Sequence, residues 1–233
     1  MDSVAQSLIA AERKAEALFD EVVATGLIRP GVLESELTAE IHALAQQRFG
    51  LRRHWHKRIV RAGSNTLLTY RDESTDRRLA ADDIVYLDFG PVFDAWEADF
   101  GRTYALGNDP FKQRLVHDIG AAFARGKELY KFTPALTAGG LYDYVAALAA
   151  PLGWEFGAAT AGHLIGHFPH EQARRGEPPL SIRHGNDIPL RAPDRDGHVR
   201  HWILEIHFVD RARQIGGFYE ELLTLDSRSL VAA

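Results

Sequence analysis

The amino-acid sequence predicts an α+β fold made of two similar halves around a central site. Four segments have the apolar spacing of amphipathic helices, two pairs of apolar segments have the character of strands, and the order helix, helix, hairpin occurs twice. The stretches GVLESELTAEIHALAQQRFG and ALTAGGLYDYVAALAAPLGW, one from each half, are also loosely alike. We therefore expect residues 1–233 to form a single domain with pseudo-symmetric halves.

The first half begins with a predicted helix over residues 3–25, because its apolar side chains repeat at helical spacing and Gly26 can end it. A second amphipathic helix is predicted near 34–48. The apolar segments 83–90 and 92–104 follow as a candidate hairpin.

The second half repeats this order. Asn108-Asp109-Pro110 is a suitable helix start, since proline fits the first helical position, and another helix is predicted near 138–150. Segments 202–209 and 215–225 form the second candidate hairpin. Before this hairpin, residues 172–200 are rich in Arg, Pro, Gly and Asp, which predicts a long surface loop bordering a site.

Composition excludes several classes of function. The 233-residue chain has no cysteine, which excludes disulfides, thiolate metal sites and thiol catalysis. Its net charge of −5, without a basic tail, argues against nucleic acid as the main partner. No apolar run approaches the length of a membrane span, and the charged N-terminus does not have the pattern of a signal peptide. We therefore expect a cytoplasmic protein.

Carboxylates are embedded in the apolar strands. Asp88 lies in IVYLDFG and Glu205 in WILEIHFV, where an unpaired charge would be costly. Hairpins that turn at residues 93–94 and 212–213 would place each of them directly opposite a second acidic residue, on one face of the sheet. The pairs predicted in this way are Asp88 with Asp99 and Glu205 with Glu220. Such pairs are destabilising unless a metal ion neutralises them, although the acids could instead be solvated hairpin residues.

A histidine-rich segment, AGHLIGHFPHE at residues 161–171, is the second source of chemistry. His163, flanked by Gly162, is the preferred metal ligand, and His170 lies beside Glu171. A histidine satisfied in the core or at the surface is the alternative. One imidazole and four carboxylates suit manganese, iron, cobalt or zinc in a two-metal centre.

These motifs together resemble a known family. Asp88, Asp99 followed by FGRT, GHLIGHFPHE, LEIHF and FYEELLTL are similar in order and spacing to the methionine aminopeptidase, aminopeptidase P and prolidase family. The resemblance covers roughly residues 5–225 and implies the pita-bread fold, with two αβ halves around a dinuclear metal centre. We expect the catalytic domain alone, without the extra N-terminal domain of aminopeptidase P and prolidase.

The resemblance implies a role for each matching residue. The implied metal ligands are Asp88, Asp99, His163, Glu205 and Glu220. Glu221 is a rival for the last position, but hairpin pairing favours Glu220. His170 matches the histidine that stabilises the tetrahedral intermediate, and Thr103 is expected to support the ligands from the same strand face as Asp99.

The sequence departs from the family in three places. Counting back from Asp88 by the family spacing reaches Tyr70, where a catalytic histidine is usual; His54 or His56 could supply the missing group. The glutamate strand reads Glu-Ile where Glu-Pro is usual. His207 shares the strand face of Glu205, and it is either directed toward the centre or structural.

The resemblance therefore implies a metal-dependent exopeptidase, of the aminopeptidase or X-Pro type, that hydrolyses short peptides with two divalent ions. Glu205 would act as general acid and base, His170 would stabilise the oxyanion, and Tyr70 would donate a hydrogen bond to the substrate. The alternatives are a creatinase-like hydrolase of a non-peptide C–N bond and a non-catalytic binding module of the same fold. A homodimer is left open.

Overall fold

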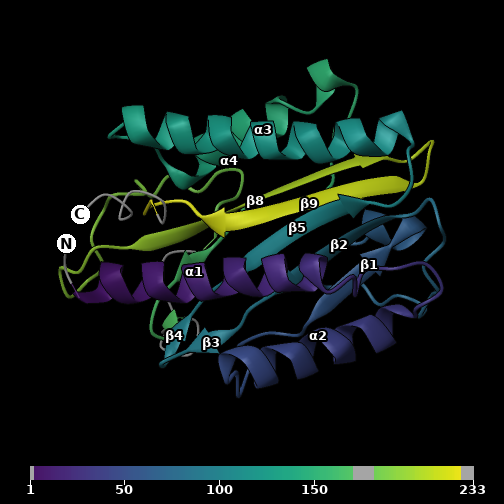
Figure 1. Ribbon diagram of the computed structural model, residues 1–233. Helices are drawn as coiled ribbons and strands as arrows, with labels where there is room; N and C mark the ends of the chain where they lie inside the picture. The colour runs from purple at the N-terminus through teal and green to yellow at the C-terminus, as the bar shows by residue number, and fades with distance from the viewer. Residues whose placement is uncertain (1–2, 170–180, 227–233) are drawn as a thin grey trace.

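The computed structural model describes residues 3–169 and 181–226, in which helices lie along an antiparallel sheet (Figure 1). The helices are α1 (Ser3–Ala24), α2 (Glu34–Phe49), α3 (Pro110–Phe132) and α4 (Ala138–Ala147), with short 3₁₀ helices η1 (Gly63–Leu67) and η2 (Ala150–Leu152). The strands are β1 (Ile59–Ala62), β2 (Ile84–Phe89), β3 (Val92–Phe93), β4 (Trp96–Glu97), β5 (Phe100–Ala105), β6 (Glu155–Phe156), β7 (Leu164–Ile165), β8 (His201–Asp210) and β9 (Ile215–Leu222).

The sheet joins the two halves of the chain side by side. Its strand order is β1-β2-β5-β9-β8-β6, with β7 also paired to β8, while β3 and β4 form a separate small hairpin. The first half contributes β1, β2 and β5, and the second contributes the remaining strands. They meet where β5 pairs with β9, at Gly101 opposite Glu220. We call this junction of β5 and β9 the seam; it places the second strand of the first hairpin beside the second strand of the other.

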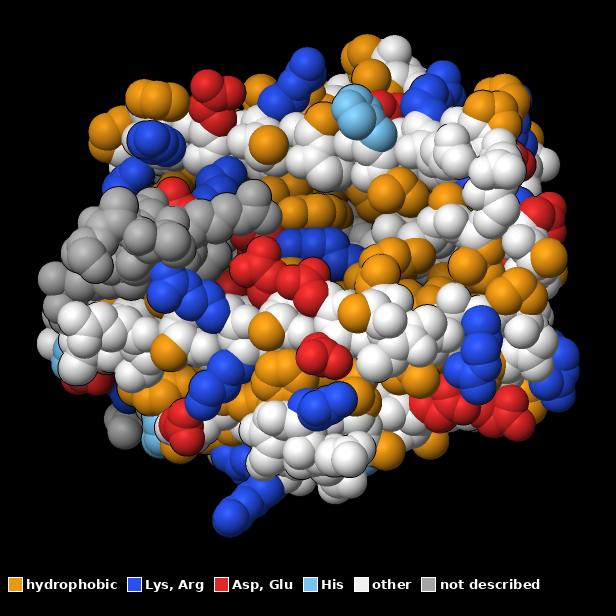
Figure 2. All heavy atoms as spheres, in the orientation of Figure 1, with side chains coloured by type: hydrophobic (Ala, Val, Ile, Leu, Met, Phe, Trp, Pro, Cys, Tyr) orange, Lys and Arg blue, Asp and Glu red, His pale blue; other side chains and the backbone are white. Residues whose placement is uncertain are grey.

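Alternation along the strands separates two faces of the sheet. One set of alternate residues packs into the helix-covered cores of the two halves: Val85, Leu87 and Phe89 in β2, and Leu204, Ile206 and Phe208 in β8. The intervening residues line a cavity instead: Tyr86, Asp88, Glu205 and His207. On the helix side, acidic and basic side chains are interspersed over α1 and α3 (Figure 2). Each half thus buries its own core and leaves one strand face for chemistry.

Local sequence explains where the helices begin. Asp109 caps α3, because its Oδ1 accepts a hydrogen bond from the Phe111 N–H at 2.8 Å, and Pro110 occupies the first turn. The Thr137 hydroxyl caps α4 by accepting from the Gly140 N–H at 3.0 Å. The four predicted helices are confirmed with small shifts at their ends.

One of the two predicted hairpin registers is confirmed and the other is wrong. Glu205 lies opposite Glu220, as expected. Asp88 lies opposite Gly101, not Asp99. The turn falls one position later than predicted, at Asp94-Ala95, where both residues have positive φ (51° and 68°), as in a two-residue turn of type I′. The residue opposite Asp88 is thus two positions beyond Asp99. Because side chains alternate along a strand, Asp99 and Gly101 lie on the same face.

Other differences concern short elements. Strands β1, β6 and β7 were not predicted, and the predicted strand 92–104 is divided into β3, β4 and β5. Within the predicted loop 172–200, residues 181–200 contain no helix and no strand beyond isolated bridges, and 172–180 lie outside the described residues. Among helices in the described ranges, none combines the length and apolar character that crossing a bilayer requires.

Gly162 fixes the approach of the His163 segment to β8. It has φ 131°, and a Cβ there would lie 2.0 Å from the Ile203 carbonyl oxygen. The neighbouring backbone bond, from the Ile203 N–H to the His163 carbonyl, is 2.9 Å long. No side chain can therefore be added without moving one of the two segments.

We expect Gly162→Ala to lower the free energy of unfolding by about 3 kcal/mol, because backbone strain and a backbone clash combine. Gly153→Ala is the matched control: it also needs positive φ (82°) but has nothing within 4 Å, so about 1 kcal/mol is expected. Chemical denaturation of both variants measures the difference. Equal losses would mean that the close approach contributes nothing.

Candidate metal centre

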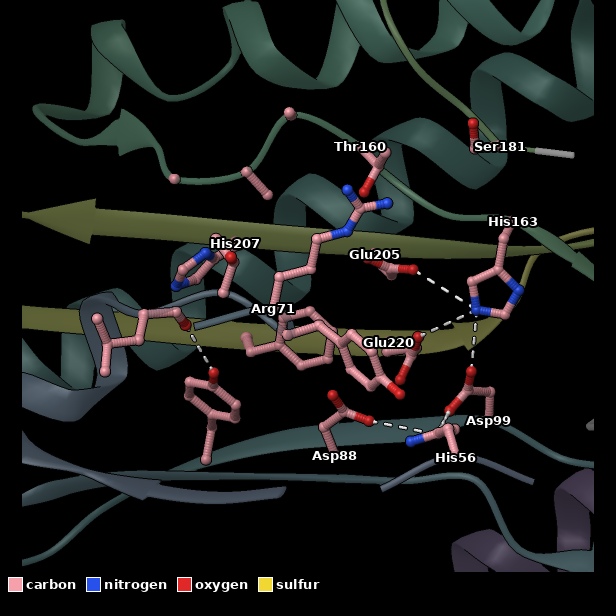
Figure 3. A pocket seen from close by; sticks show the side chains of 18 of the residues that line it. His56, Arg71, Asp88, Asp99, Thr160, His163, Ser181, Glu205, His207 and Glu220 are labelled. Atoms are coloured by element: carbon pink, nitrogen blue, oxygen red, sulfur yellow. Dashed lines mark hydrogen bonds and ion pairs between the residues drawn. The ribbon is translucent and has the colours of Figure 1, made fainter. Parts of the chain in front are cut away.

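The cavity beside the sheet has a volume of about 880 Å³ and an acidic floor (Figure 3). Its carboxylates come from four different places: Asp88 from β2, Asp99 from just before β5, Glu205 from β8 and Glu220 from β9. Gly101 explains why they can converge. A Cβ at this residue would lie 2.9 Å from the Glu220 Cβ and closer still to Phe218, so the missing side chain leaves room at the seam.

His163 joins this cluster, as the sequence predicts. Its Nε2 lies 3.0 Å from Asp99 Oδ2, 3.6 Å from Glu205 Oε1 and 3.9 Å from Glu220 Oε1. Its Nδ1 lies 2.8 Å from the Leu164 carbonyl oxygen, which can only accept, so Nδ1 carries the hydrogen. The ring is thereby oriented with Nε2 toward the carboxylates.

His56 also lies in the cluster, in the segment between α2 and β1. Its Nε2 is 2.9 Å from Asp99 Oδ1 and 3.6 Å from Asp88 Oδ1, and its side chain is only 5% exposed. Sequence reasoning considered His56 only as a substitute for the catalytic histidine. The HWH triplet was the available signal, but nothing in its spacing distinguished His56 from His54.

Tyr70, predicted to stand at the usual position of that histidine, lies at the wall of the cavity. It is 48% exposed, and its ring centroid is 5.8 Å from that of His56. The Lys57 ammonium lies over its ring at 4.5 Å. The structure therefore places an imidazole, rather than this phenol, against the carboxylates.

Thr103 and His207, also considered in the sequence, form hydrogen bonds with the backbone. The Thr103 hydroxyl forms two hydrogen bonds of 2.7 Å with the backbone of Phe218 and so connects β5 to β9. The sequence predicts that Thr103 supports the metal ligands, but these bonds are to the backbone and not to a carboxylate. His207 is buried with its Nε2 2.9 Å from the Thr66 carbonyl oxygen, an arrangement that serves structure. His170 lies outside the described residues.

Glu221, the rival of Glu220, is engaged elsewhere. Its Oε2 accepts a hydrogen bond of 2.6 Å from Arg102, whereas Glu220 lines the cavity. His54 packs against Phe89 rather than facing the cluster, and burial lowers its pKa to about 3.

Burial and neighbouring charges shift the pKa values of the clustered carboxylates. Burial, together with the Asp99 and Asp88 carboxylates, raises the pKa of Glu220 well above its usual value. Burial, offset in part by His56, raises the pKa of Asp88 to about 7. For Asp99, burial alone would raise the pKa, but His56 and His163 hold it below the usual range. The floor of the cavity therefore requires positive charge.

The two imidazoles can supply this charge as protons. Burial alone would lower their pKa values, but the Asp99 and Asp88 carboxylates raise the pKa of His56 to about 10. The hydrogen bond and charge of Asp99 likewise raise the pKa of His163 to about 9. Both rings would hold a proton at neutral pH wherever no other cation replaces it.

A divalent cation fits this donor set. In the cavity, two groups have ligand atoms within 4.8 Å of one another: His56 with Asp88 and Asp99, and Asp99 with His163 and Glu220. Among the described residues, Glu220 Oε2 is buried without a hydrogen-bond partner. Buried carboxylates that share a site and lack donors are suited to metal ions, and mixed imidazole and carboxylate ligands suit first-row transition metals.

Comparison with known proteins identifies the class to which this centre belongs. Residues 6–215 match metallopeptidase family M24, so the chain belongs to that family. Its fold is the pita-bread fold that the sequence motifs predict.

Particular relatives narrow the comparison. The chain is 27% identical over 177 residues to an Xaa-Pro dipeptidase of Lactobacillus helveticus, covering 76% of this chain and 46% of that protein. The prolidase from Pyrococcus horikoshii OT3 superimposes with a TM-score of 0.75 at 19% identity, over 97% of this chain and 60% of that one. Methionine aminopeptidase from Rickettsia prowazekii superimposes with a TM-score of 0.67 at 17% identity, over 94% of this chain and 95% of that one. The chain spans about half the length of the curated relatives it matches.

Metal binding should release protons. Because the pKa of His163 is raised to about 9 without a metal, its ring is protonated at pH 7 and must lose the proton to become a ligand. Apparent affinity for Mn²⁺ should therefore rise with pH from 7 toward about 9. Calorimetric titration in buffers of different ionisation enthalpy measures the release, with at least one proton expected at pH 7. Binding without proton release would contradict the raised pKa.

Proposed function

We propose that this chain is a metal-dependent exopeptidase that hydrolyses short peptides, of the Xaa-Pro type. The observation that carries the proposal is the convergence of four carboxylates and His163 on the floor of a cavity, in a chain of family M24. Relatives named Xaa-Pro dipeptidase support the choice of peptide substrate. The proposed ligands of two divalent ions are Asp88, Asp99, His163, Glu205 and Glu220, with manganese, cobalt, iron or zinc as the ions.

The bound ions would polarise the scissile carbonyl and lower the pKa of a water molecule. Glu205 is the proposed proton carrier. Its side chain is 17% exposed and lines the cavity, and burial raises its pKa, which brings the carboxylate nearer to the pH at which it can both accept and return a proton. His170 is the proposed donor to the developing oxyanion.

The charge distribution of the cavity suits a short zwitterionic substrate. Arg71 and Arg183 also line the cavity, and the Arg71 side chain extends across it toward Thr160 (Figure 3). A dipeptide carries an ammonium group at one end and a carboxylate at the other. Guanidinium groups bind carboxylates well, so these arginines favour a substrate that ends within the cavity.

Glu205→Gln tests the proton carrier. Activity should first be detected with a dipeptide library that includes Xaa-Pro members, on protein loaded with manganese or cobalt. The substitution keeps the side-chain size but removes the proton acceptor and one metal-binding charge, so kcat should fall by about 10² or more. Glu155→Gln, on an exposed side chain that pairs with Arg211, is the control and should leave kcat unchanged.

Hydrolysis of N-blocked proteins at internal positions, with no dipeptide or tripeptide cleaved, would contradict the exopeptidase proposal. Hydrolysis of a non-peptide C–N bond alone would favour a creatinase-like activity instead.

Tyr70 is proposed to contact the substrate from the cavity wall. A phenol donates a hydrogen bond but is poorly suited to carrying protons near neutral pH, because its unperturbed pKa is about 10. We therefore expect Tyr70→Phe to lower the turnover of a dipeptide by about five-fold, the effect of one lost hydrogen bond of about 1 kcal/mol. Steady-state kinetics measure this. An unchanged rate would show that the phenol hydroxyl has no role.

A further inference from the structure

We infer that His56 is a second imidazole ligand of the metal centre, bound through Nε2 to the ion on the Asp88 side of Asp99. This inference rests on the proposed metal centre and adds a ligand that the family motifs do not contain. It follows from four features of His56: its relation to His163, its tautomer, its spacing and the way in which the fold holds it.

His56 and His163 are placed equivalently about Asp99. His56 Nε2 lies 2.9 Å from Asp99 Oδ1, and His163 Nε2 lies 3.0 Å from Asp99 Oδ2. Each ring also approaches a further carboxylate at 3.6 Å, Asp88 for His56 and Glu205 for His163. Whatever cation His163 binds on one side of Asp99, His56 can bind on the other.

The tautomer of His56 directs a lone pair at the carboxylates. Its Nδ1 lies 2.6 Å from the Lys57 carbonyl oxygen, which cannot donate, so Nδ1 carries a hydrogen. In a neutral ring the lone pair is then on Nε2, which faces carboxylate oxygens that also only accept. A proton on Nε2 or a metal ion in its place satisfies these acceptors, so a metal ion can replace the proton without moving the ring.

The spacing is that of neighbouring ligands on one ion. Ligand atoms at about 2.1 Å from a metal, at angles between 90° and 110°, lie about 3 to 3.5 Å from each other. The distances from His56 Nε2 to Asp99 Oδ1 and Asp88 Oδ1, 2.9 and 3.6 Å, lie at the two limits of this range, about 0.1 Å beyond each.

The fold holds His56 in this position. Trp55 is fastened to the hairpin that precedes β5, because its Nε1 donates to the Ala98 carbonyl at 3.0 Å and its backbone N–H donates to the Gly90 carbonyl at 2.9 Å. Gly90 provides the space: a Cβ there would lie 2.1 Å from His56 Cδ2 and 2.4 Å from Nε2. The DFG segment of β2 therefore leaves room for an imidazole directly after Asp88.

Direct ligation is tested by nuclear magnetic resonance on protein with isotope-labelled histidine nitrogens, loaded with a magnetically active cadmium isotope. Scalar coupling between cadmium and nitrogen requires a bond between them. We expect two coupled Nε2 signals in the parent protein and one in His56→Gln, which also assigns the lost signal. Gly90→Ala should remove the same coupling without changing the ring, because its Cβ occupies the place of His56.

Calorimetric titration with Co²⁺ provides the second readout. His56→Gln and Gly90→Ala should bind the ion on the Asp88 side at least about ten-fold more weakly than the parent. His117→Ala is the control for loss of a histidine, since that side chain is 81% exposed on α3, and it should bind as the parent does.

The outcomes separate the two proposals. Coupling of His163 without coupling of His56 would overturn this inference and leave the metal centre intact; a weaker affinity of His56→Gln would then reflect positioning of Asp99. Absence of coupling from both rings would overturn the metal centre itself, and the inference with it.

Discussion

Mutual repulsion among buried carboxylates is the constraint on which the rest of this structure depends. Asp88, Asp99, Glu205 and Glu220 converge at the seam of the sheet, where burial makes each negative charge costly. Strands are suited to hold such a cluster, because every second side chain faces the cavity while its neighbours are anchored in a core. The helices on the other face therefore contribute to the site by making the strands rigid.

The sequence predicted which four acids share one face of the sheet, but it predicted only one of the two strand registers correctly. The β8–β9 ladder runs without interruption from its turn, so simple counting paired Glu205 with Glu220 correctly. Counting was wrong for Asp88, because β3 and β4 interpose a hairpin whose turn lies one position later. The error of two residues preserved the strand face, so the acids were still grouped together. Alternation is a more robust guide than register when turns are irregular.

The position of His56 could not be predicted for a different reason. It lies in a segment without periodicity, and its orientation depends on contacts with residues 90–98, far along the chain. Counting from Asp88 by the family spacing reached Tyr70, which lines the cavity, and this count carries no information about His56. Gly90, which follows Asp88 in DFG, leaves the space for this imidazole, but the sequence alone does not show that the two residues are neighbours.

The narrow seam between β5 and β9 has a consequence for unfolding. Each half has a main core of its own, and the registered backbone pairing between them is Gly101 with Glu220, beside the Thr103 hydrogen bonds and a small apolar cluster at Phe218. An ion held there would act as a cross-link between distant parts of the chain, and it would close long loops whose entropy opposes association of the halves. Ligation would thus add to the packing that already joins the halves, whereas a chelator would remove that contribution to the free energy of unfolding.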